Sequence, residues 1–461
     1  MKAWVCYFSV CVLASSAVLL PNRPVMAASS DSENSSNQTI EERIQDQEKR
    51  IFQLERQLHE MELSAQTEKP TGSTAAPDLL EAGDIRRDQA NVTTASELAS
   101  STFPGSWPMF GTDFRMKIGG YFKADALYDV DGTGDEYQFL ISQIPVSGTL
   151  EDGRAGYFNM FVRETRFNFD VRKSEGEYPQ KFFLEMDFFD ESSFSPRLRH
   201  AYYQYGHLLV GQTWTILTEL RAINYMLDFA YGDAIFGGRS VQVRWEQPIN
   251  EQWSWMAGLE NLSDPAIDSQ GAVGVASSKY PLLAGRMTYE DDSTLFTFGG
   301  MVDQLRWDGE GVGPDATATG WAVIMGGRQT FGPRDDYVAW SLSYGDGAGG
   351  NIAALAGQNT NATLLPDGTL ETNKTYNVSL GYTHNFTDKL ATNLNYAWVE
   401  VATNSRPVDS IKKGSNAHAN LIYKIWKSTF IGIEYMWGQR TNVSGADGTA
   451  TRVQTSLQFN Y

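Results

Sequence analysis

The stretch Arg452-Val-Gln-Thr-Ser-Leu-Gln-Phe-Asn-Tyr461 ends the chain and decides the fold class. Its odd-numbered residues are apolar or aromatic, with one threonine among them, and its even-numbered residues are all polar. Successive side chains of a β-strand point to opposite faces of a sheet. The stretch is therefore predicted to be a strand with one apolar and one polar face.

The same alternation recurs throughout the chain from Phe114 onward. The clearest further examples are residues 167–171, 241–245, 338–344, 378–382, 394–398 and 431–437. Stretches rich in glycine and aspartate, such as 129–136, 309–320 and 345–350, separate the alternating runs and suit tight turns or solvated loops. Residues 111–461 are therefore predicted to form one all-β domain.

A soluble β-sandwich would also alternate, but three features favour a transmembrane barrel. Charged residues lie well inside the predicted strands, where a packed core would not tolerate them. Tryptophan and tyrosine lie near strand ends, where a bilayer interface favours them. The strands reach about ten residues, the length that a tilted membrane-spanning strand needs. At roughly 20–22 residues per strand and connection, we predict about 16 antiparallel strands around a water-filled lumen.

Composition excludes two other classes. The 461 residues carry a formal net charge of −19, which argues against a protein that binds the nucleic-acid backbone. Beyond the N-terminus there is no run of about 20 apolar residues, so a bundle of membrane helices is not expected.

Residues 1–28 are predicted to be a secretory signal peptide. Lys2 precedes the apolar stretch Val5–Leu20, and Val25-Met26-Ala27 resembles a cleavage site. A membrane anchor is disfavoured because the apolar stretch is short and interrupted by serines. Both cysteines fall in this segment, so the exported chain is expected to have no disulfide and no thiolate metal site.

A heptad repeat follows within residues 32–66. Its core positions are Ile40, Ile44, Gln47, Ile51, Leu54, Leu58 and Met61. Because charged residues at the flanking positions obey the same repeat, we favour a parallel α-helical coiled coil over a single amphipathic helix lying on its own domain. Residues 67–110 have the composition of a flexible linker.

Taken together, these features resemble a family of Gram-negative outer-membrane channels, the DcaP-like porins. The residues that carry the resemblance are the signal peptide, the heptads, the blocks Arg197–Tyr205 and Leu209–Trp214, and the terminal Gln458–Tyr461. The resemblance implies a homotrimer in the outer membrane, in contact with lipid and lipopolysaccharide, with its coiled coil in the periplasm. It also implies uptake of small organic anions such as dicarboxylates, without a cofactor. Phe459 and Tyr461 would serve as a signal to the barrel-assembly machinery.

The connection Thr213–Gly238 is predicted to constrict the pore. It is too long for a periplasmic turn and too apolar for a solvated loop, and resembling porins fold the corresponding loop into the lumen. An external lid packed on the rim would also fit its length. Asp228 and Asp233 of this connection are candidate constriction residues.

Arginines on polar strand faces are predicted to select anions at that constriction. The candidates are Arg166, Arg199, Arg221, Arg239, Arg244 and Arg286. Arginine suits a carboxylate because its planar fork donates two parallel hydrogen bonds. Any one of them could instead make a structural pairing, with Glu164, Asp170, Glu246 or Asp228. The acidic total charge is expected to lie on outer loops and on the coil, farther than a screening length of about 8 Å from the pore.

No motif predicts catalysis or a metal site. The five histidines have no spacing suited to a shared metal, and Asp129–Glu136 resembles a calcium loop but lacks its ligand periodicity. No local motif supports an outer-membrane hydrolase. The sequence is also compatible with a general or phosphate-selective diffusion porin, and with an envelope tether that acts through the coil.

Overall fold

The computed structural model describes residues 103–173, 178–189, 195–230, 235–261, 265–355, 357–402 and 405–461. The predicted signal peptide, coiled coil and most of the linker lie outside these residues, as does Asp233. In the described part of the chain, no helix is both long enough and apolar enough to cross a membrane.

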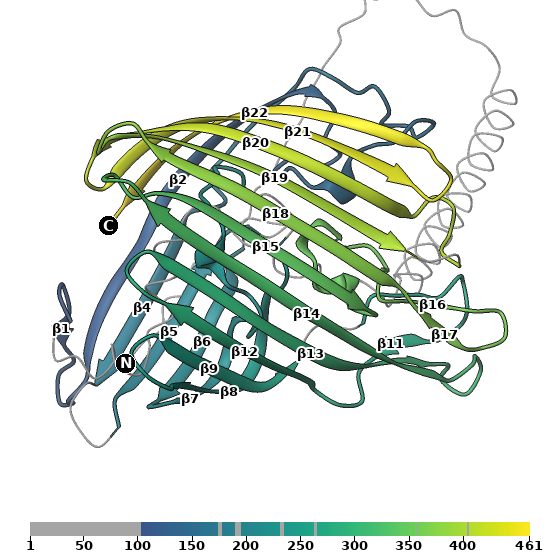
Figure 1. Ribbon diagram of the computed structural model, residues 1–461, viewed down its shortest axis with the longest axis horizontal. Helices are drawn as coiled ribbons and strands as arrows, with labels where there is room; N and C mark the ends of the chain where they lie inside the picture. Colours follow the sequence, from purple (N-terminus) through teal and green to yellow (C-terminus); the bar gives the residue numbers. More distant parts are fainter. Residues whose placement is uncertain are drawn as a thin grey trace, which may run out of the picture. The chain divides into compact units, whose positions relative to one another are not determined.

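The described residues form a closed antiparallel barrel of 16 strands, as the sequence predicts, when β3 and β4 are counted as one interrupted strand (Figure 1). The strands of the wall are β2 (Arg115–Asp131), β3 (Tyr157–Phe161), β4 (Arg166–Lys173), β5 (Gln180–Asp187), β6 (Arg197–Tyr205), β7 (Leu208–Trp214), β8 (Arg239–Pro248), β9 (Trp253–Asn261), β12 (Leu282–Glu290), β13 (Thr294–Asp308), β14 (Ala316–Phe331), β15 (Asp336–Asp346), β18 (Lys374–Asn385), β19 (Leu390–Ala402), β20 (Ile411–Trp426), β21 (Thr429–Asn442) and β22 (Asp447–Asn460).

Shorter elements belong to the N-terminal approach and to the loops. They are β1 (Trp107–Pro108), η2 (Ile141–Gln143), η3 (Leu220–Ala222), β10 (Ile267–Asp268), β11 (Val275–Ser277), η4 (Gly349–Asn351), η5 (Ala353–Leu355), β16 (Ala362–Leu364) and β17 (Leu370–Thr372). The η elements are 3-10 turns. Strands β10, β16 and β17 form a separate small sheet in two of the loops.

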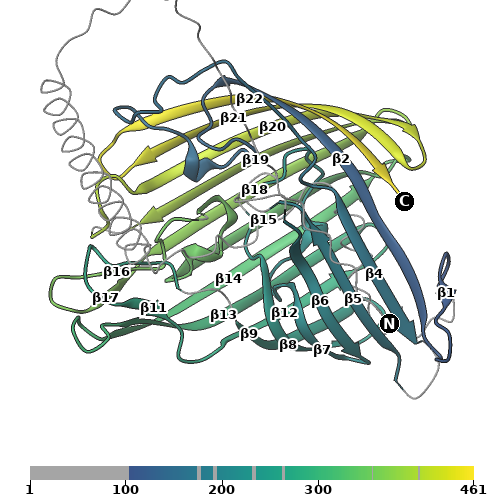
Figure 2. The ribbon, with the colours of Figure 1, turned by 180° about the vertical axis from the view of Figure 1, so that it is seen from behind.

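The barrel closes where β2 pairs with β22, next to each other in Figure 2. On the side of β2 opposite β22, the first half of β2 pairs with β4 and the second half pairs with β3. Closure leaves no unpaired sheet edge in the described wall, so the backbone amides that cross the lipid are hydrogen-bonded within the protein.

The last strand has the two faces that its sequence predicts. Gln454 and Gln458 are buried inside the barrel, whereas Leu457 and Phe459 are 40% and 44% exposed on its outer surface. This is the reverse of a soluble protein, in which apolar side chains are buried. The outer surface therefore suits lipid, and the polar inner face suits water or other polar groups.

The terminal Tyr461 ties the closure together. Its backbone N–H donates to the carbonyl of Gly120 (3.3 Å), and its hydroxyl donates to the carbonyl of Arg166 (3.0 Å). Gly120 has φ +143°, and a Cβ there would lie 2.1 Å from the Arg166 carbonyl oxygen, so a side chain cannot be accommodated. The terminal tyrosine thus makes a contact that a phenylalanine could not.

Short turns and long loops lie at opposite ends of the barrel. Connections such as 206–207, 291–293 and 427–428 are at the same end as the C-terminus, and connections 132–156, 215–238 and 347–373 are at the other end. Outer-membrane barrels have short periplasmic turns and longer extracellular loops. The C-terminal end is accordingly the periplasmic one.

The lumen is not open over its whole length: besides connection 213–238, for which the sequence predicts an inward path, two further long connections enter it. One apolar cluster inside the barrel combines Ile141 of connection 132–156, Ile216 and Phe236 of connection 215–238, and Ile352 and Leu355 of connection 347–373. Inward side chains of the wall complete the cluster. The three long loops therefore fold inward and pack on one another, which narrows the path for solutes.

Candidate functional site

The connection between β7 and β8, here called the inner loop (residues 215–238, of which 231–234 are not described), lies inside the barrel. At its base, Thr215 N–H donates to the Gly238 carbonyl (2.8 Å), and Ile216 N–H donates to the Glu260 carboxylate (2.5 Å). These bonds turn the chain away from the wall as soon as β7 ends. The segment therefore lies in the lumen, as one of the two alternatives has it, and does not form an external lid on the rim.

The tip of the inner loop is fastened to the opposite wall. Glu434 of β21 accepts a hydrogen bond from Leu227 N–H (2.6 Å). The Leu227 carbonyl accepts from Lys123 of β2 (2.7 Å) and from Gln454 of β22 (2.8 Å). Because backbone groups in a buried loop need partners, these polar wall residues decide where the loop can lie.

A second attachment holds the middle of the loop against β18 and β19. The Asn224 amide donates to the Leu394 carbonyl (2.7 Å), and Asn395 donates to the Asn224 side-chain oxygen (3.3 Å). A Cβ on Gly381 would lie 2.0 Å from that oxygen, so glycine leaves the space that Asn224 occupies. The inner loop therefore spans the lumen from β7 and β8 to the wall formed by β18–β22.

Asp228 joins two inward loops to each other. Its carboxylate accepts hydrogen bonds from Phe139 N–H (3.1 Å) and Ala230 N–H (3.0 Å). Burial raises the pKa of Asp228, which lies in the loop outside the membrane-spanning strands, to about 6. The hydrogen bonds described for this candidate constriction residue all come from backbone groups, and no described ion pair joins it to any of the six predicted arginines.

Two predicted arginines meet on the inner wall of β4–β6. Arg199 binds Glu185 (Nε to Oε1, 2.8 Å) and Asp187 (Nη1 to Oδ2, 3.1 Å). Arg166 lies 3.6 Å from the same Glu185. Arg197, which sequence reasoning missed, also binds Asp187 (2.7 Å). Guanidinium and carboxylate groups therefore form one continuous network along this wall.

Two more predicted arginines share one carboxylate at the root of the inner loop. Arg221 binds Glu219 (2.8 Å) and Glu290, and Arg286 lies 3.3 Å from Glu219 while donating to the Thr218 carbonyl (2.6 Å). Burial alone would raise the pKa of Glu219, but the two guanidinium groups lower it to about 2. Glu219 thus stays ionised and fixes both arginines.

The remaining two arginines flank Trp214, the last residue of β7. Arg239 lies over the indole ring, with its guanidinium carbon 4.9 Å from the ring centre. Arg244 donates to the Trp214 carbonyl (3.3 Å) and lies 3.7 Å from Glu246, longer than the other arginine pairs. Its buried Nε has no hydrogen-bond partner among the described residues. Arg244 is therefore the predicted arginine whose described carboxylate contact is longest.

The structure thus places all six arginines inside the barrel but in three groups, with carboxylates between them. Of the predicted structural pairings, the described ion pairs include Glu246 with Arg244; Glu164 binds Lys123, and Asp170 binds Arg172 and Lys181. Glu185, Asp187 and Glu219 are partners that sequence reasoning did not name. Their inward strand phase was the available signal for the first two, since both alternate with apolar residues of β5.

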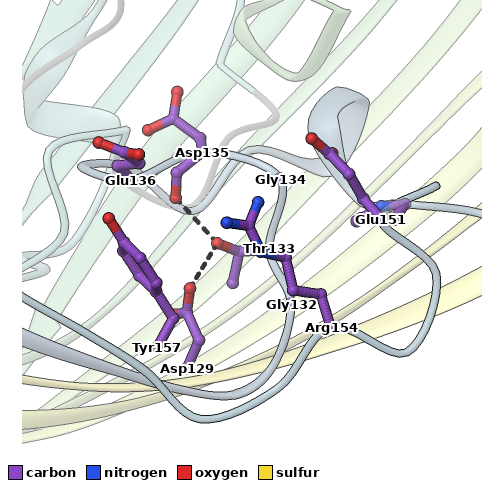
Figure 3. Close-up of a pocket in the computed structure, with 10 residues that line it drawn as sticks. Asp129, Gly132, Thr133, Gly134, Asp135, Glu136, Glu151, Arg154 and Tyr157 are labelled. Atoms are coloured by element: carbon purple, nitrogen blue, oxygen red, sulfur yellow. Dashed lines mark hydrogen bonds between the residues drawn. The ribbon is translucent and has the colours of Figure 1, made fainter.

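The calcium-like segment Asp129–Glu136 is organised around an arginine. Arg452 of β22 binds the Asp129 carboxylate through Nε (2.5 Å) and Nη2 (2.9 Å), and also donates to the carbonyl oxygens of Asp135 (2.5 Å) and Gln138 (2.8 Å). The adjoining pocket has a volume of about 120 Å³. Figure 3 shows that the Thr133 hydroxyl, which lines this pocket, donates hydrogen bonds to the Asp129 carboxylate and the Asp135 carbonyl. Among the described residues, no group of His, Cys, Asp and Glu is arranged to hold a metal.

Comparison with known proteins identifies the family. The family model of the DcaP outer membrane protein matches residues 78–461. The chain belongs to this family.

Solved structures agree with this assignment at the level of the fold. The outer membrane channel DcaP of Acinetobacter baumannii superposes with a TM-score of 0.66 at 20% identity, over 77% of this chain and 100% of that one. The in-vitro folded outer membrane protein OmpT of Vibrio cholerae gives 0.50 at 12% identity, over 77% and 99%. A search of curated protein sequences finds no match. This DcaP family protein is an outer-membrane channel, and the inner loop lies across its path.

The anchor of the inner loop can be tested in this porin with Glu434→Gln. The substitution removes the charge that accepts from Leu227, His418 and Asn420, and hydrogen bonds to a charged group contribute about 1.5–3 kcal/mol. We expect the loop to leave the wall about ten-fold more often or more, seen as added current fluctuations in single-channel recordings. Glu400→Gln, at the far end of β19, is the matched control and should record like the wild type. Quiet currents from a folded Glu434→Gln barrel would show that other contacts hold the loop.

Proposed function

We propose that this outer-membrane channel passes small anions in preference to cations, with organic dicarboxylates as its solute class. The observation that carries the proposal is the charge of the inner wall from β4 to β8. Basic side chains there outnumber acidic ones. The basic residues are Arg166, Arg172, Lys181, Arg197, Arg199, Arg239 and Arg244, and the acidic ones are Asp170, Glu185, Asp187 and Glu246.

Three acidic residues elsewhere in the lumen have structural roles. Glu434 fastens the inner loop, Asp129 binds Arg452, and Glu164 binds Lys123. A carboxylate whose charge is matched by a buried cation or by backbone N–H groups contributes little field to the path. On the described strands β4–β8, basic side chains thus exceed acidic ones beside the inner loop, where a ring of like charges would set the sign of the permeant ion.

Arg199→Gln tests the anion preference. The change leaves Glu185 and Asp187 with less compensating charge, so the reversal potential in a salt gradient should move toward cations, with the anion-to-cation permeability ratio falling about two-fold or more. Lys173→Gln removes one charge from an exposed pair with Asp113 (2.9 Å) at the periplasmic end, and should change the ratio little. A wild-type channel that clearly prefers cations would refute the proposal.

The position of two arginine groups on one inner wall supports the dicarboxylate class. One carboxylate of a solute could contact Arg244 while the other meets the network of Arg166 and Arg199, because these groups lie on neighbouring parts of one inner wall. Arg244 suits the exchangeable contact, since its pair with Glu246 is long and one of its nitrogens lacks a partner among the described residues.

Conductance block by succinate, an aromatic dicarboxylate and phosphate tests this class. We expect a dicarboxylate to block best in the wild type, and Arg244→Ala to weaken that block by about ten-fold, since a charged hydrogen bond contributes about 1.5–3 kcal/mol. Arg306→Ala, which removes a partly exposed arginine paired with Asp308 on the loop side (2.6 Å), is the control. Equal block by all three anions would indicate a general diffusion pore, and strongest block by phosphate a phosphate-selective one.

We also propose that the chain assembles as a homotrimer and that the heptads of residues 32–66 form a periplasmic coiled coil that holds the trimer. The support is the heptad itself, with matching charges beside its core. Native mass spectrometry of a chain lacking residues 32–101 should show loss of trimers while each barrel stays folded. Intact trimers together with weakened cell envelopes would favour a tethering role for the coil instead.

A further inference from the structure

A cavity of about 690 Å³ lies inside the barrel between the inner loop and the periplasmic turns. Ile223 and Tyr225 of the inner loop line it, as do Asp292, Asp335 and Lys427 of the short turns. Its volume is within the range of about 300–1,000 Å³ that small-molecule sites occupy. The cavity thus lies between the inner loop and the periplasmic end of the barrel.

Three basic side chains line the cavity without a carboxylate partner in the described part of the chain. They are Arg328 of β14, Lys424 of β20 and Lys427 of the turn that follows β20. The described ion pairs include none of the three, although Asp292 and Asp335 line the same cavity. The six arginines predicted from the sequence differ, because most of them are bound to glutamate or aspartate.

Arg328 is aimed into the cavity by its neighbours. It follows the inward phase of β14, which is set by Ala322, Ile324 and Gly326. Its guanidinium lies 5.6 Å from the ring centre of Tyr337, and its Nε is buried without a hydrogen-bond partner among the described residues. A buried guanidinium nitrogen without an acceptor costs free energy that an anionic ligand would recover.

Aromatic side chains make up another part of the wall of the cavity. Tyr225 of the inner loop meets Phe430 of β21 edge to face, with ring centres 5.7 Å apart. Tyr337 and Trp426 add further aromatic surface. Aromatic rings offer flat apolar contact and favour offset or edge-on packing with another ring. The cavity therefore presents cations and flat apolar surface to the same occupant.

We propose that this cavity is a second binding site of the channel, on the exit side of the inner loop, for an organic carboxylate with a flat apolar body. Arg328 and Lys424 contact the carboxylate, and the rings of Tyr225 and Phe430 contact the apolar body. The site rests on the proposed function, because the solute reaches it from outside only through an anion-permeable constriction. Several weak sites in series let a solute enter and still leave.

Conductance block by benzoate tests the site, with acetate as an anion of equal charge and little apolar surface. The anions are added to one side of a planar bilayer at a time. Asp388→Cys, in the short turn after β18, marks the periplasmic side of the inserted channel: this is the side from which a membrane-impermeant thiol reagent modifies it. The native cysteines, Cys6 and Cys11, fall in the predicted signal peptide and should not compete for the reagent. From that side, benzoate should block the wild type at about ten-fold lower concentration than acetate.

Variants separate the two parts of the site. Arg328→Gln and Lys424→Gln should each weaken benzoate block by about five-fold, as expected for a charged contact in a partly hydrated site. Phe430→Ala should reduce the advantage of benzoate over acetate and leave acetate block unchanged. Lys389, in a neighbouring periplasmic turn, does not line the cavity. Benzoate should therefore block Lys389→Gln as it blocks the wild type.

The outcomes also distinguish this inference from the proposed function. Wild-type block in Arg328→Gln and Lys424→Gln, or equal block by benzoate and acetate, would overturn the site even if the reversal potential shows anion preference. A cation-preferring wild type in which benzoate block still depends on Arg328 and Lys424 would overturn the proposed function and leave this site standing.

Discussion

A polypeptide that crosses lipid has no water with which to hydrogen-bond its backbone, and this constraint governs the molecule. Pairing β2 with β22 satisfies it by removing the free edges of the sheet. Closure then forces each strand to have a lipid side and a lumen side. The alternation of Gln454 and Gln458 with Leu457 and Phe459 is the local consequence, and the contact of Tyr461 with Gly120 and Arg166 secures the seam.

A closed barrel of this size would leave a wide lumen if its loops stayed outside. Here the polar inner face supplies the partners that an inward loop needs. Glu434, Lys123 and Gln454 bind the backbone of Leu227, and the amide of Asn224 reaches the wall in the space left by Gly381. The same inward polarity that water would satisfy is thus used to hold a loop in place, and the held loop divides the lumen into an outer part and a periplasmic cavity.

The charges of the lumen divide along the same line. Beside the inner loop, arginines are ordered by carboxylates, as Glu185 orders Arg199 and Glu219 orders Arg221. Fixed guanidinium groups lose little side-chain entropy when a solute arrives, which lowers the entropic cost of a contact with it. In the periplasmic cavity, Arg328 and Lys424 have no such partners among the described carboxylates, so they remain available to a passing anion.

The sequence predicts some features of this protein and leaves others open, for a physical reason. Strand phase is local, because side-chain direction alternates from one residue to the next. The sequence by itself therefore determined the two-faced strands, the closed barrel of about 16 strands, and the inward direction of Arg166, Arg244 and Arg286. Partners are not local: Arg199 pairs with Glu185 and Asp187 of the preceding strand, and Lys123 pairs with Glu164, 41 residues along the chain. Only the tertiary structure decided that the calcium-like Asp129 segment encloses Arg452 and that Arg328 and Lys424 lie beneath the inner loop, because strand order, register and loop path bring those groups together.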